Sequence, residues 1–281
     1  MPQWVGFNTL AAGVFGLILG SFLNVVIYRL PKILERQWRR ECAELSGSPL
    51  PEGEPFNLMV PRSHCPHCGH RIAWYENIPI FSYLFLRGRC SGCHAPISPR
   101  YPLIELFTGL CFAFCGWRWG WTPTTLAWCG FSAALITLTM IDWDTTLLPD
   151  DITLPLLWGG LLASLLGWTA TPLRAALWGA TAGYLSLWLI YQIFKLLTGK
   201  EGMGYGDFKL FAALGAWLGV DALIPVILPA SISGLIVGLI LKARRSLREG
   251  GAVPFGPFLA FGGLTVAYVG PRTLLNLLGL A

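Results

Sequence analysis

Residues 6–28 read GFNTLAAGVFGLILGSFLNVVIY, an uninterrupted stretch without a charged side chain. About 20 apolar residues in a helix are enough to cross the hydrocarbon core of a bilayer. Across the chain of 281 residues, hydrophobic residues make up 54% and charged residues only 12%, about half the charged share of a typical soluble domain. The sequence therefore predicts an all-α polytopic membrane protein.

Seven further stretches have a similar length and polarity, which predicts about eight transmembrane helices. Lipid cannot satisfy backbone N–H and C=O groups, so each span is expected to be helical. The stretch 208–221 is the shortest, and it is a candidate for a tilted or broken helix. The predicted spans are 6–28, 102–120, 123–141, 152–168, 174–195, 208–221, 222–241 and 257–279.

The basic residues predict the orientation. The first one is Arg29, so the first apolar run lacks the basic flank of a cleaved signal peptide. With these spans, 17 of the 20 Lys and Arg fall on one side of the membrane, and basic loops mark the cytoplasmic side. We therefore expect an external amino terminus; the family resemblance described below implies that the membrane is a bacterial cytoplasmic (inner) membrane. The net charge of +5 reflects this topology and contact with anionic membrane lipid, and gives no reason to expect nucleic acid.

Only residues 30–101 are polar enough to form a domain outside the membrane. This segment holds six of the 15 acidic residues and all four histidines. Its first part, including 44–55, is rich in Pro and Gly and is expected to be a loop. The predicted organisation is a first transmembrane helix (1–29), a cytoplasmic domain (30–101) and a transmembrane core (102–281).

Two Cys-x2-Cys pairs lie in the cytoplasmic segment, Cys65-Pro-His-Cys68 and Cys90-Ser-Gly-Cys93. Each such turn directs two thiolates toward one point, and two turns complete a tetrahedral four-sulfur site. The cytoplasm keeps thiols reduced, which disfavours disulfides. The spacing predicts a structural zinc ion, with free thiols, a redox pair or a nearby histidine ligand as alternatives. Gly69 and Gly92 are expected to permit the tight backbone of the turns.

Carboxylates follow the predicted span at 123–141. An acidic residue next to lipid is costly and is therefore a candidate for function. Asp142 follows the apolar run directly and is expected to lie deepest in its loop. The other three acids of this loop are expected to face solvent or to cap the next helix: Asp144, Asp150 and Asp151.

A second loop ends in Gly204-Tyr-Gly-Asp207-Phe-Lys209, directly before the span at 208–221. Asp207 opens that span, where its carboxylate can accept from free helix N–H groups. Gly204 and Gly206 allow close approach of another helix, and Lys209 is placed with them as a supporting residue.

Together, Asp142 and Asp207 can form a catalytic dyad. Two carboxylates within hydrogen-bond reach do not both ionise readily, so they share one proton. The charged member can activate water while the neutral member protonates the leaving amide. This pattern alone is weak, because a carboxylate beside a span is about as often a helix cap or an interfacial residue.

The chain resembles the type IV prepilin peptidases, which belong to the wider G-x-G-D intramembrane aspartyl proteases. Asp142 with Leu148-Pro149-Asp150 fits the first catalytic signature of the family, D-x5-[IL]-P-D, and Gly204 to Asp207 fits the second. Asp144 is a rival for the first position, but it lies two residues too close to Leu148. Three further motifs match in the family order: Gly20 to Pro31, Pro61 to Cys68 with Cys90 and Cys93, and Val253 to Leu259.

This resemblance implies an aspartic endopeptidase of type IV pilus or type II secretion systems. Such enzymes remove a basic leader from prepilins or pseudopilins, cutting after a glycine at the cytoplasmic face. They then N-methylate the new amino terminus with S-adenosylmethionine. Methylation rests on the resemblance alone, because the sequence shows no nucleotide-binding loop and the cofactor-binding residues are unknown.

Two other classes remain open from the residues. A Mg-dependent membrane lipid phosphotransferase would use Asp142, Asp144 and Asp207 to hold the metal. A proton-coupled transporter would use carboxylates as a relay, but the acids cluster at one face and no repeat symmetry appears. Metal chelation separates the first of these from an aspartyl dyad.

Overall fold

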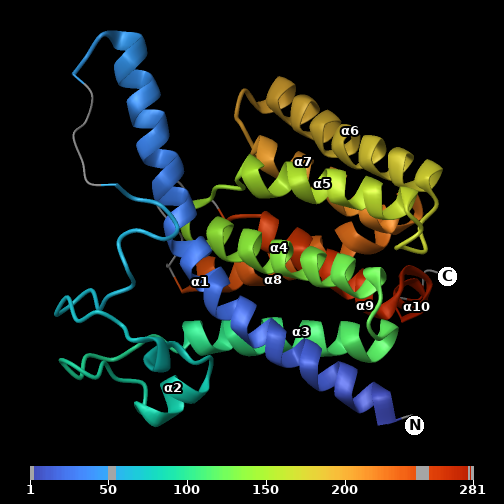
Figure 1. Cartoon of the computed structure of the whole chain (residues 1–281). Coiled ribbons are helices and arrows are strands. Elements are labelled where there is room, and N and C mark those ends of the chain that lie inside the picture. Colours follow the sequence, from blue (N-terminus) through green and yellow to red (C-terminus); the bar gives the residue numbers. More distant parts are fainter. Residues whose placement is uncertain (1–2, 50–54, 245–252, 278, 280–281) are drawn as a thin grey trace. The chain divides into compact units, whose positions relative to one another are not determined.

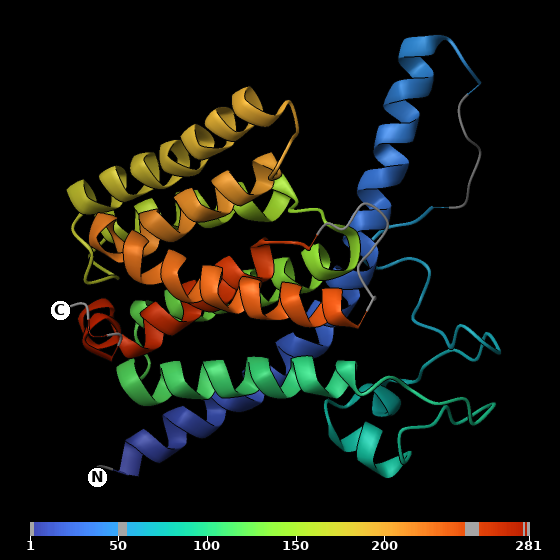
Figure 2. The same cartoon turned by 180° about the vertical axis from the view of Figure 1, so that it is seen from behind.

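The computed structural model describes residues 3–49, 55–244, 253–277 and 279, and its regular elements are all helices (Figures 1 and 2). No strand occurs in that part of the chain, which contains only two isolated β-bridges. The expected all-α class is confirmed. The α-helices are α1 (Gln3–Ser46), α2 (Phe81–Phe85), α3 (Arg100–Trp119), α4 (Pro123–Thr145), α5 (Asp150–Leu165), α6 (Leu173–Thr198), α7 (Tyr205–Leu218), α8 (Leu223–Ala243), α9 (Gly256–Val269) and α10 (Pro271–Leu277), with 3-10 helices η1 (Trp74–Asn77) and η2 (Val220–Ala222).

Four described helical stretches are long and apolar enough to cross a membrane: α1, α4, α6 and Val220–Ala243. The bent pair α9–α10 raises the number to five if it counts as one span. These helices make the chain a multi-pass membrane protein, but the expected eight spans are not confirmed. Helices do occupy the other predicted positions, but α5 and α7 have only 16 and 14 residues.

Two helices differ in continuity from what the sequence predicted. The expected span 257–279 is interrupted, because α9 and α10 are bent by 104°. Gly270 at the bend has φ +94°, a conformation that glycine adopts without strain. At the other end of the chain, α1 continues through Pro31 to Ser46, where a loop was expected from residue 30. Residues 32–46 are rich in Leu, Glu, Arg and Gln, which favour helix.

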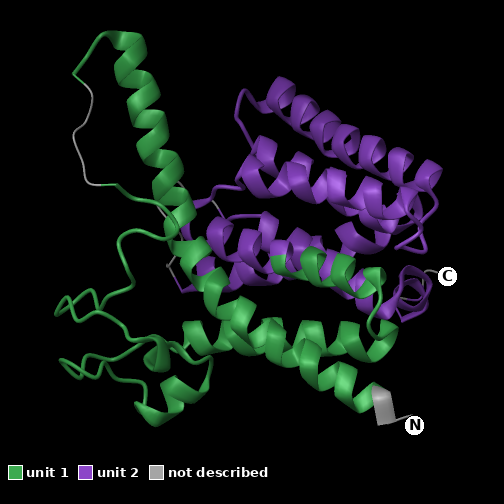
Figure 3. Cartoon of the chain, in the orientation of Figure 1, with its two compact units in different colours: residues 1–133 green, residues 134–281 purple. Residues whose placement is uncertain are grey.

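The chain forms two compact units, residues 1–133 and 134–281, with the boundary inside α4 (Figure 3). The three-part division predicted from polarity, with boundaries at 29 and 101, is a different description and stays a prediction. Arg245 and Arg248, which entered the charge count, lie outside the described residues.

In the first unit, α1 packs on α3 through small residues. A Cβ atom at Gly16 would lie 2.7 Å from Phe112 Cβ, and one at Gly20 would lie 2.8 Å from the Glu105 Cα atom. Asn24 Nδ2 donates to the Tyr101 carbonyl at 3.2 Å. Small residues let two membrane helices approach closely, so their contact is made largely by backbone and Cβ atoms.

In the second unit, α7 is surrounded by other helices. Between Asp207 and Trp217, only Lys209 is not buried. The Trp217 indole donates to the Leu156 carbonyl of α5 at 2.7 Å. On the α6 side, a Cβ atom added at Gly215 would overlap the carbonyl oxygen of Gly179. The helix that begins with the second acidic motif is therefore the protein-enclosed centre of this unit.

Candidate active site and metal centre

Asp142 lies in the last turn of α4. Its side chain is only 4% exposed, and the following turn closes when the Thr146 N–H donates to the Asp142 carbonyl at 2.8 Å. Thr146 has φ +56°, which ends the helix directly after this turn. Asp144, the rival for this position, is exposed. Asp142, which the spacing to Leu148 favours as the first aspartate of the motif, is therefore the buried one of the two candidates.

Asp207 lies in the first turn of α7 and is 7% exposed. Gly204 is the N-cap residue, and its backbone N–H bonds to the Asp207 carboxylate. The Asp207 Oδ1 atom is buried and accepts no hydrogen bond from any residue that the structure describes. The Asp207 and Asp142 carboxyl groups interact electrostatically. Both acids are thus buried in the same unit, although they lie 65 residues apart in the sequence (207 minus 142), and each is near enough to affect the charge of the other.

Leu148 belongs to the first motif, and it packs against the second motif and against the start of α9. A Cβ atom at Gly206 would lie 2.7 Å from Leu148 Cβ, so the glycine is required by this contact. Gly256, at the beginning of α9, approaches both Leu148 and Asp142: its added Cβ would lie 2.5 Å from Asp142 Oδ2. In the sequence, Gly256 was noted only as a member of the motif 253–259. Nothing in the sequence alone indicated that it forms a wall of the aspartate site.

An ion pair joins the helices that follow the two aspartates. Lys209 Nζ lies 2.7 Å from both carboxylate oxygens of Asp150, the first residue of α5. The side chains are 30% and 53% exposed, so solvent screens their attraction and the pair contributes little to stability. The pair can instead position the site, because it holds α7 against α5 at Lys209, two residues after Asp207. Asp150 was expected to face solvent or to act as a cap, so its partner was missed.

We expect Lys209→Met to lower peptide cleavage by roughly tenfold, because small displacements of reacting groups have large effects on rate. The exchange of both charges, Asp150→Lys with Lys209→Asp, should recover a substantial part of that loss. Cleavage of a prepilin-like peptide by the purified variants measures this. Asp151→Asn, a change at the neighbouring exposed carboxylate, is the control. If the double variant cleaves no faster than Asp150→Lys or Lys209→Asp alone, the ion pair does not position the site.

The four predicted metal ligands form a second cluster. The Sγ atoms of Cys65, Cys68, Cys90 and Cys93 all lie within 4.8 Å of one another. Sulfurs bound at about 2.3 Å around a tetrahedral ion would be about 3.8 Å apart. The Cys65–Cys93 separation is 3.8 Å. The donor set and its size therefore fit a four-coordinate metal ion.

The two cysteine turns have the same backbone hydrogen bonds. Gly69 N–H donates to the Cys65 carbonyl, and His94 N–H donates to the Cys90 carbonyl. Both donors have positive φ, +72° and +58°. Gly92, in contrast, does not have a positive φ. A side chain at this position would be close to His70, because an added Cβ would lie 3.2 Å from His70 Cβ. Residues 65–71 and 90–96 thus have the same backbone turn, in agreement with the two Cys-x2-Cys pairs of the sequence.

The electrostatics of the thiols also favour a cation. Backbone N–H groups of His67 and Cys68 lower the pKa of the Cys65 thiol to about 7. For Cys68, the N–H of His70 lowers the pKa, but burial and the neighbouring thiols outweigh it and raise the pKa to about 11. Ionising one thiol makes the next harder to ionise. A bound dication removes that conflict and holds all four as thiolates.

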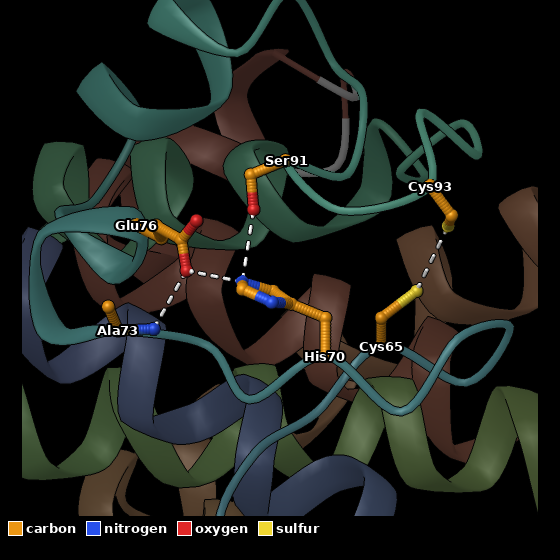
Figure 4. Close-up of polar contacts among 6 residues, drawn as sticks. All are labelled: Cys65, His70, Ala73, Glu76, Ser91 and Cys93. Atoms are coloured by element: carbon orange, nitrogen blue, oxygen red, sulfur yellow. Dashed lines mark hydrogen bonds and ion pairs between the residues drawn. The ribbon is translucent and has the colours of Figure 1, made fainter.

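A polar network next to the cluster joins the two turns (Figure 4). His70 Nε2 lies 3.1 Å from both Glu76 Oε2 and Ser91 Oγ. The Ala73 N–H donates to the same Glu76 oxygen at 2.8 Å. Both contacts use one ring nitrogen, so this is not a nucleophile–base–acid relay, which needs both nitrogens. None of the four histidines belongs to the cluster of metal-capable side chains found among the described residues.

Helices that are long and apolar enough to cross a membrane, a buried pair of carboxyl groups and a four-cysteine cluster are the features of a membrane protein with a candidate acid–base site. Residues 129–239 match the model of the type IV leader peptidase family, and residues 14–119 match that of the bacterial peptidase A24 N-terminal domain. The chain belongs to the type IV leader peptidase family. The resemblance drawn from the motifs is confirmed.

Several curated relatives carry the name "Prepilin leader peptidase/N-methyltransferase". The chain is 54% identical to the one from Aeromonas hydrophila over 267 residues, which cover 92% of this chain and 89% of the relative. It is 52% identical to that from Pseudomonas putida, covering 92% and 88%. It is 50% identical to that from Burkholderia pseudomallei strain 1026b, covering 94% and 86%. No solved structure matches the chain.

Proposed function

We propose that this protein is a prepilin peptidase and N-methyltransferase that uses Asp142 and Asp207 as its catalytic dyad. It removes the leader from prepilins or pseudopilins and methylates the new amino terminus, as the names and the high identity of its relatives support. The observation that carries the dyad is that both carboxyl groups are buried around Leu148, which lies against Gly206, next to Asp207, and against Gly256, which approaches Asp142. Because a shared proton is favourable only for such a pair, the site is suited to acid–base chemistry.

In the proposed reaction, the ionised carboxylate of the dyad removes a proton from water as the water oxygen attacks the scissile carbonyl carbon. The neutral carboxyl group hydrogen-bonds the carbonyl oxygen, on which negative charge develops. When the tetrahedral intermediate collapses, a proton passes from the dyad to the amide nitrogen, and the C–N bond breaks. Gly204 N–H, bonded to the Asp207 carboxylate, orients one acid, while Gly256 and Leu148 confine the other.

The proposed orientation places the amino terminus outside and the dyad at the cytoplasmic boundary of an inner membrane. The excess of basic residues on one side supports it. A prepilin has its basic leader in the cytoplasm and its apolar helix in the bilayer, so its cut site after glycine lies at the same level. The substrate helix then approaches from the side, through lipid, and the leader meets the acidic dyad.

The methyl donor is proposed to be S-adenosylmethionine, in keeping with the methyltransferase name of the relatives. It supplies the methyl group for the amino terminus that cleavage creates. We assign no residues to its site. The metal of the cysteine cluster is proposed to be zinc, which thiolate ligands favour. With four sulfur ligands it has no open position, so its role is to hold residues 60–100 together.

The structure does not favour the lipid phosphotransferase. That reading needs Asp142, Asp144 and Asp207 to hold one metal ion. Among the described residues, the four cysteines are the only group of three or more His, Cys, Asp or Glu side chains close enough to share a metal ion, and Asp144 is exposed. No specific observation supports the transporter, and the acidic pair lies at the ends of two helices.

The proposed function is tested by incubating the purified enzyme with a prepilin-like peptide and S-adenosylmethionine, followed by mass spectrometry. We expect a cut after the glycine and a mature fragment heavier by one methyl group. An excess of EDTA should leave the cut intact within the assay time, because the dyad needs no metal. Abolition of cleavage by EDTA while the cysteine-bound metal is retained would refute the aspartyl mechanism.

A separate test concerns the cysteine cluster. Metal analysis of the purified protein should give about one zinc ion per chain. Cys68→Ser and Cys93→Ser should each lower that content and increase hydrogen exchange in residues 60–100, because the ion closes this segment. Cys42→Ser, a change at an exposed cysteine outside the cluster, should have neither effect. Wild-type protein with no zinc and four reactive thiols would contradict the assignment.

A further inference from the structure

The apolar face of the short helix α2 is exposed. Phe81, Leu84 and Phe85 occupy positions i, i+3 and i+4, which share one face of a helix. Their exposed fractions are 70%, 65% and 88%. Just before them, Trp74 and Tyr75 are 81% and 58% exposed, and their rings contact each other at 5.9 Å. These five side chains are called the aromatic patch, and such an exposed cluster marks an interaction site.

The loop that carries α2 is fixed to the buried part of α3. The Ile80 N–H donates to Glu105 Oε2 at 2.8 Å, and Glu105 is also hydrogen-bonded to Ser21. Ile80 has φ +62°, a strained conformation for a β-branched residue. Strain of this kind persists only when the surroundings determine it. The position of α2 is therefore specified by a buried carboxyl group and is not that of a loose loop.

The contact between Ile80 and Glu105 lies beside the apolar run of α1. Ser21 precedes Arg29, the first charged residue of the chain, by eight residues, which is about 12 Å along a helix. Glu105 also lies against Gly20, where an added Cβ would be 2.8 Å from its Cα. The backbone of Ile80 is thus held at a depth where α1 is flanked by apolar residues. The loop that carries α2 is therefore attached to a membrane-embedded part of the first unit, so α2 cannot lie far from the bilayer.

The charged residues around the aromatic patch indicate which kind of surface it would bind. Three exposed arginines flank it in the sequence: Arg71, Arg87 and Arg89. Glu76 is the only acidic residue between 71 and 99, and its side chain is 8% exposed and bound to His70. The net positive field attracts anionic headgroups. It repels a basic leader, so the substrate is a poorer candidate for this surface.

We propose that the aromatic patch inserts into the headgroup region of an anionic bilayer and docks the cysteine segment on the membrane surface. Aromatic side chains are favoured at that level, and an amphipathic helix lies there with its apolar face in the acyl boundary. This inference goes beyond the peptidase assignment and does not depend on it. It makes α2 and η1 a peripheral anchor of the first unit.

The test places p-benzoylphenylalanine at Phe85 of the full-length protein in nanodiscs made of phosphatidylglycerol and phosphatidylcholine. After irradiation, mass spectrometry of the proteolytic peptide should show lipid adducts. The same label at Leu45, which is 91% exposed near the end of α1, is the matched control and should give several-fold fewer. Adducts at Phe85 no more frequent than at Leu45, or adducts to protein instead of lipid, would overturn the proposal.

Lipid composition tests the electrostatic part. Adducts at Phe85 should decrease several-fold in nanodiscs of phosphatidylcholine alone. The triple change Arg71→Gln, Arg87→Gln and Arg89→Gln should produce a similar decrease in the anionic nanodiscs. Equal labelling in both lipids would overturn the assignment of an anionic surface. An unchanged metal content of the triple variant shows that the cysteine segment is still folded.

Discussion

Asp142→Asn and Asp207→Asn are each expected to reduce cleavage of a prepilin-like peptide by roughly 10³-fold or more, the scale on which loss of one member of a catalytic unit acts. The amide is nearly isosteric with the acid, so the buried positions of both residues remain filled. It cannot exchange the proton that the proposed reaction passes between the acids. Mass spectrometry of the peptide, with S-adenosylmethionine present, measures the loss.

The double variant separates a dyad from two independent residues. Groups that act as one unit are non-additive, so removing both acids should cost little more than removing one. Asp144→Asn, at the exposed neighbour of Asp142, should retain most activity. An inactive Asp144→Asn beside an active Asp142→Asn would show that the first catalytic aspartate is wrongly assigned.

Gly256→Ala is expected to have the second largest effect, a loss of roughly 100-fold in cleavage rate with little loss of stability. The added methyl group would lie 2.5 Å from Asp142 Oδ2 and 3.1 Å from Leu148 Cδ1. A short carboxylate can move aside at small cost to the fold. Displacement of a reacting group by about 1 Å is enough to lower a rate by that factor.

Gly238→Ala is the matched control for this prediction. Gly238 lies inside α8, and an added Cβ there meets nothing within 4 Å. Alanine favours helix over glycine by about 1 kcal/mol, so the variant should be at least as stable as the parent and fully active. Thermal unfolding of both variants in detergent checks stability. If Gly256→Ala cleaves at the parent rate, the contact of α9 with Asp142 is not part of the active site.

The short motifs in the sequence pointed to residues that the structure buries. The spacing from Asp142 to Leu148 and the motif ending at Asp207 singled out two acids that are both buried, and their catalytic role stays a prediction. The four cysteines were also identified, because a metal turn places its ligands by local backbone geometry. Both depend on short segments, for which residue spacing carries most of the information.

What the sequence missed depends on contacts between distant segments. The approach of Gly256 to Asp142 and the ion pair of Asp150 with Lys209 require the helices to be arranged first. The number of spans was not confirmed for a related reason. An apolar run of 14 to 16 residues, such as α7 or α5, has the composition of a membrane helix, but its surroundings can be protein instead of lipid.

The enclosure of α7 has a consequence for which substitutions the chain tolerates. Its middle is made of small side chains, such as Ala212, Ala213 and Ala216, each at most 2% exposed, so added volume has nowhere to go. In α8, Leu235 and Leu239 are 64% and 58% exposed, so side chains of other sizes fit there. A charged side chain at these positions would be costly in lipid. In a saturation mutagenesis experiment, fitness along α7 should therefore follow side-chain volume, whereas fitness along the outer face of α8 should follow hydrophobicity. Two apolar helices of the same unit would then be distinguished by the kind of substitution that each does not tolerate.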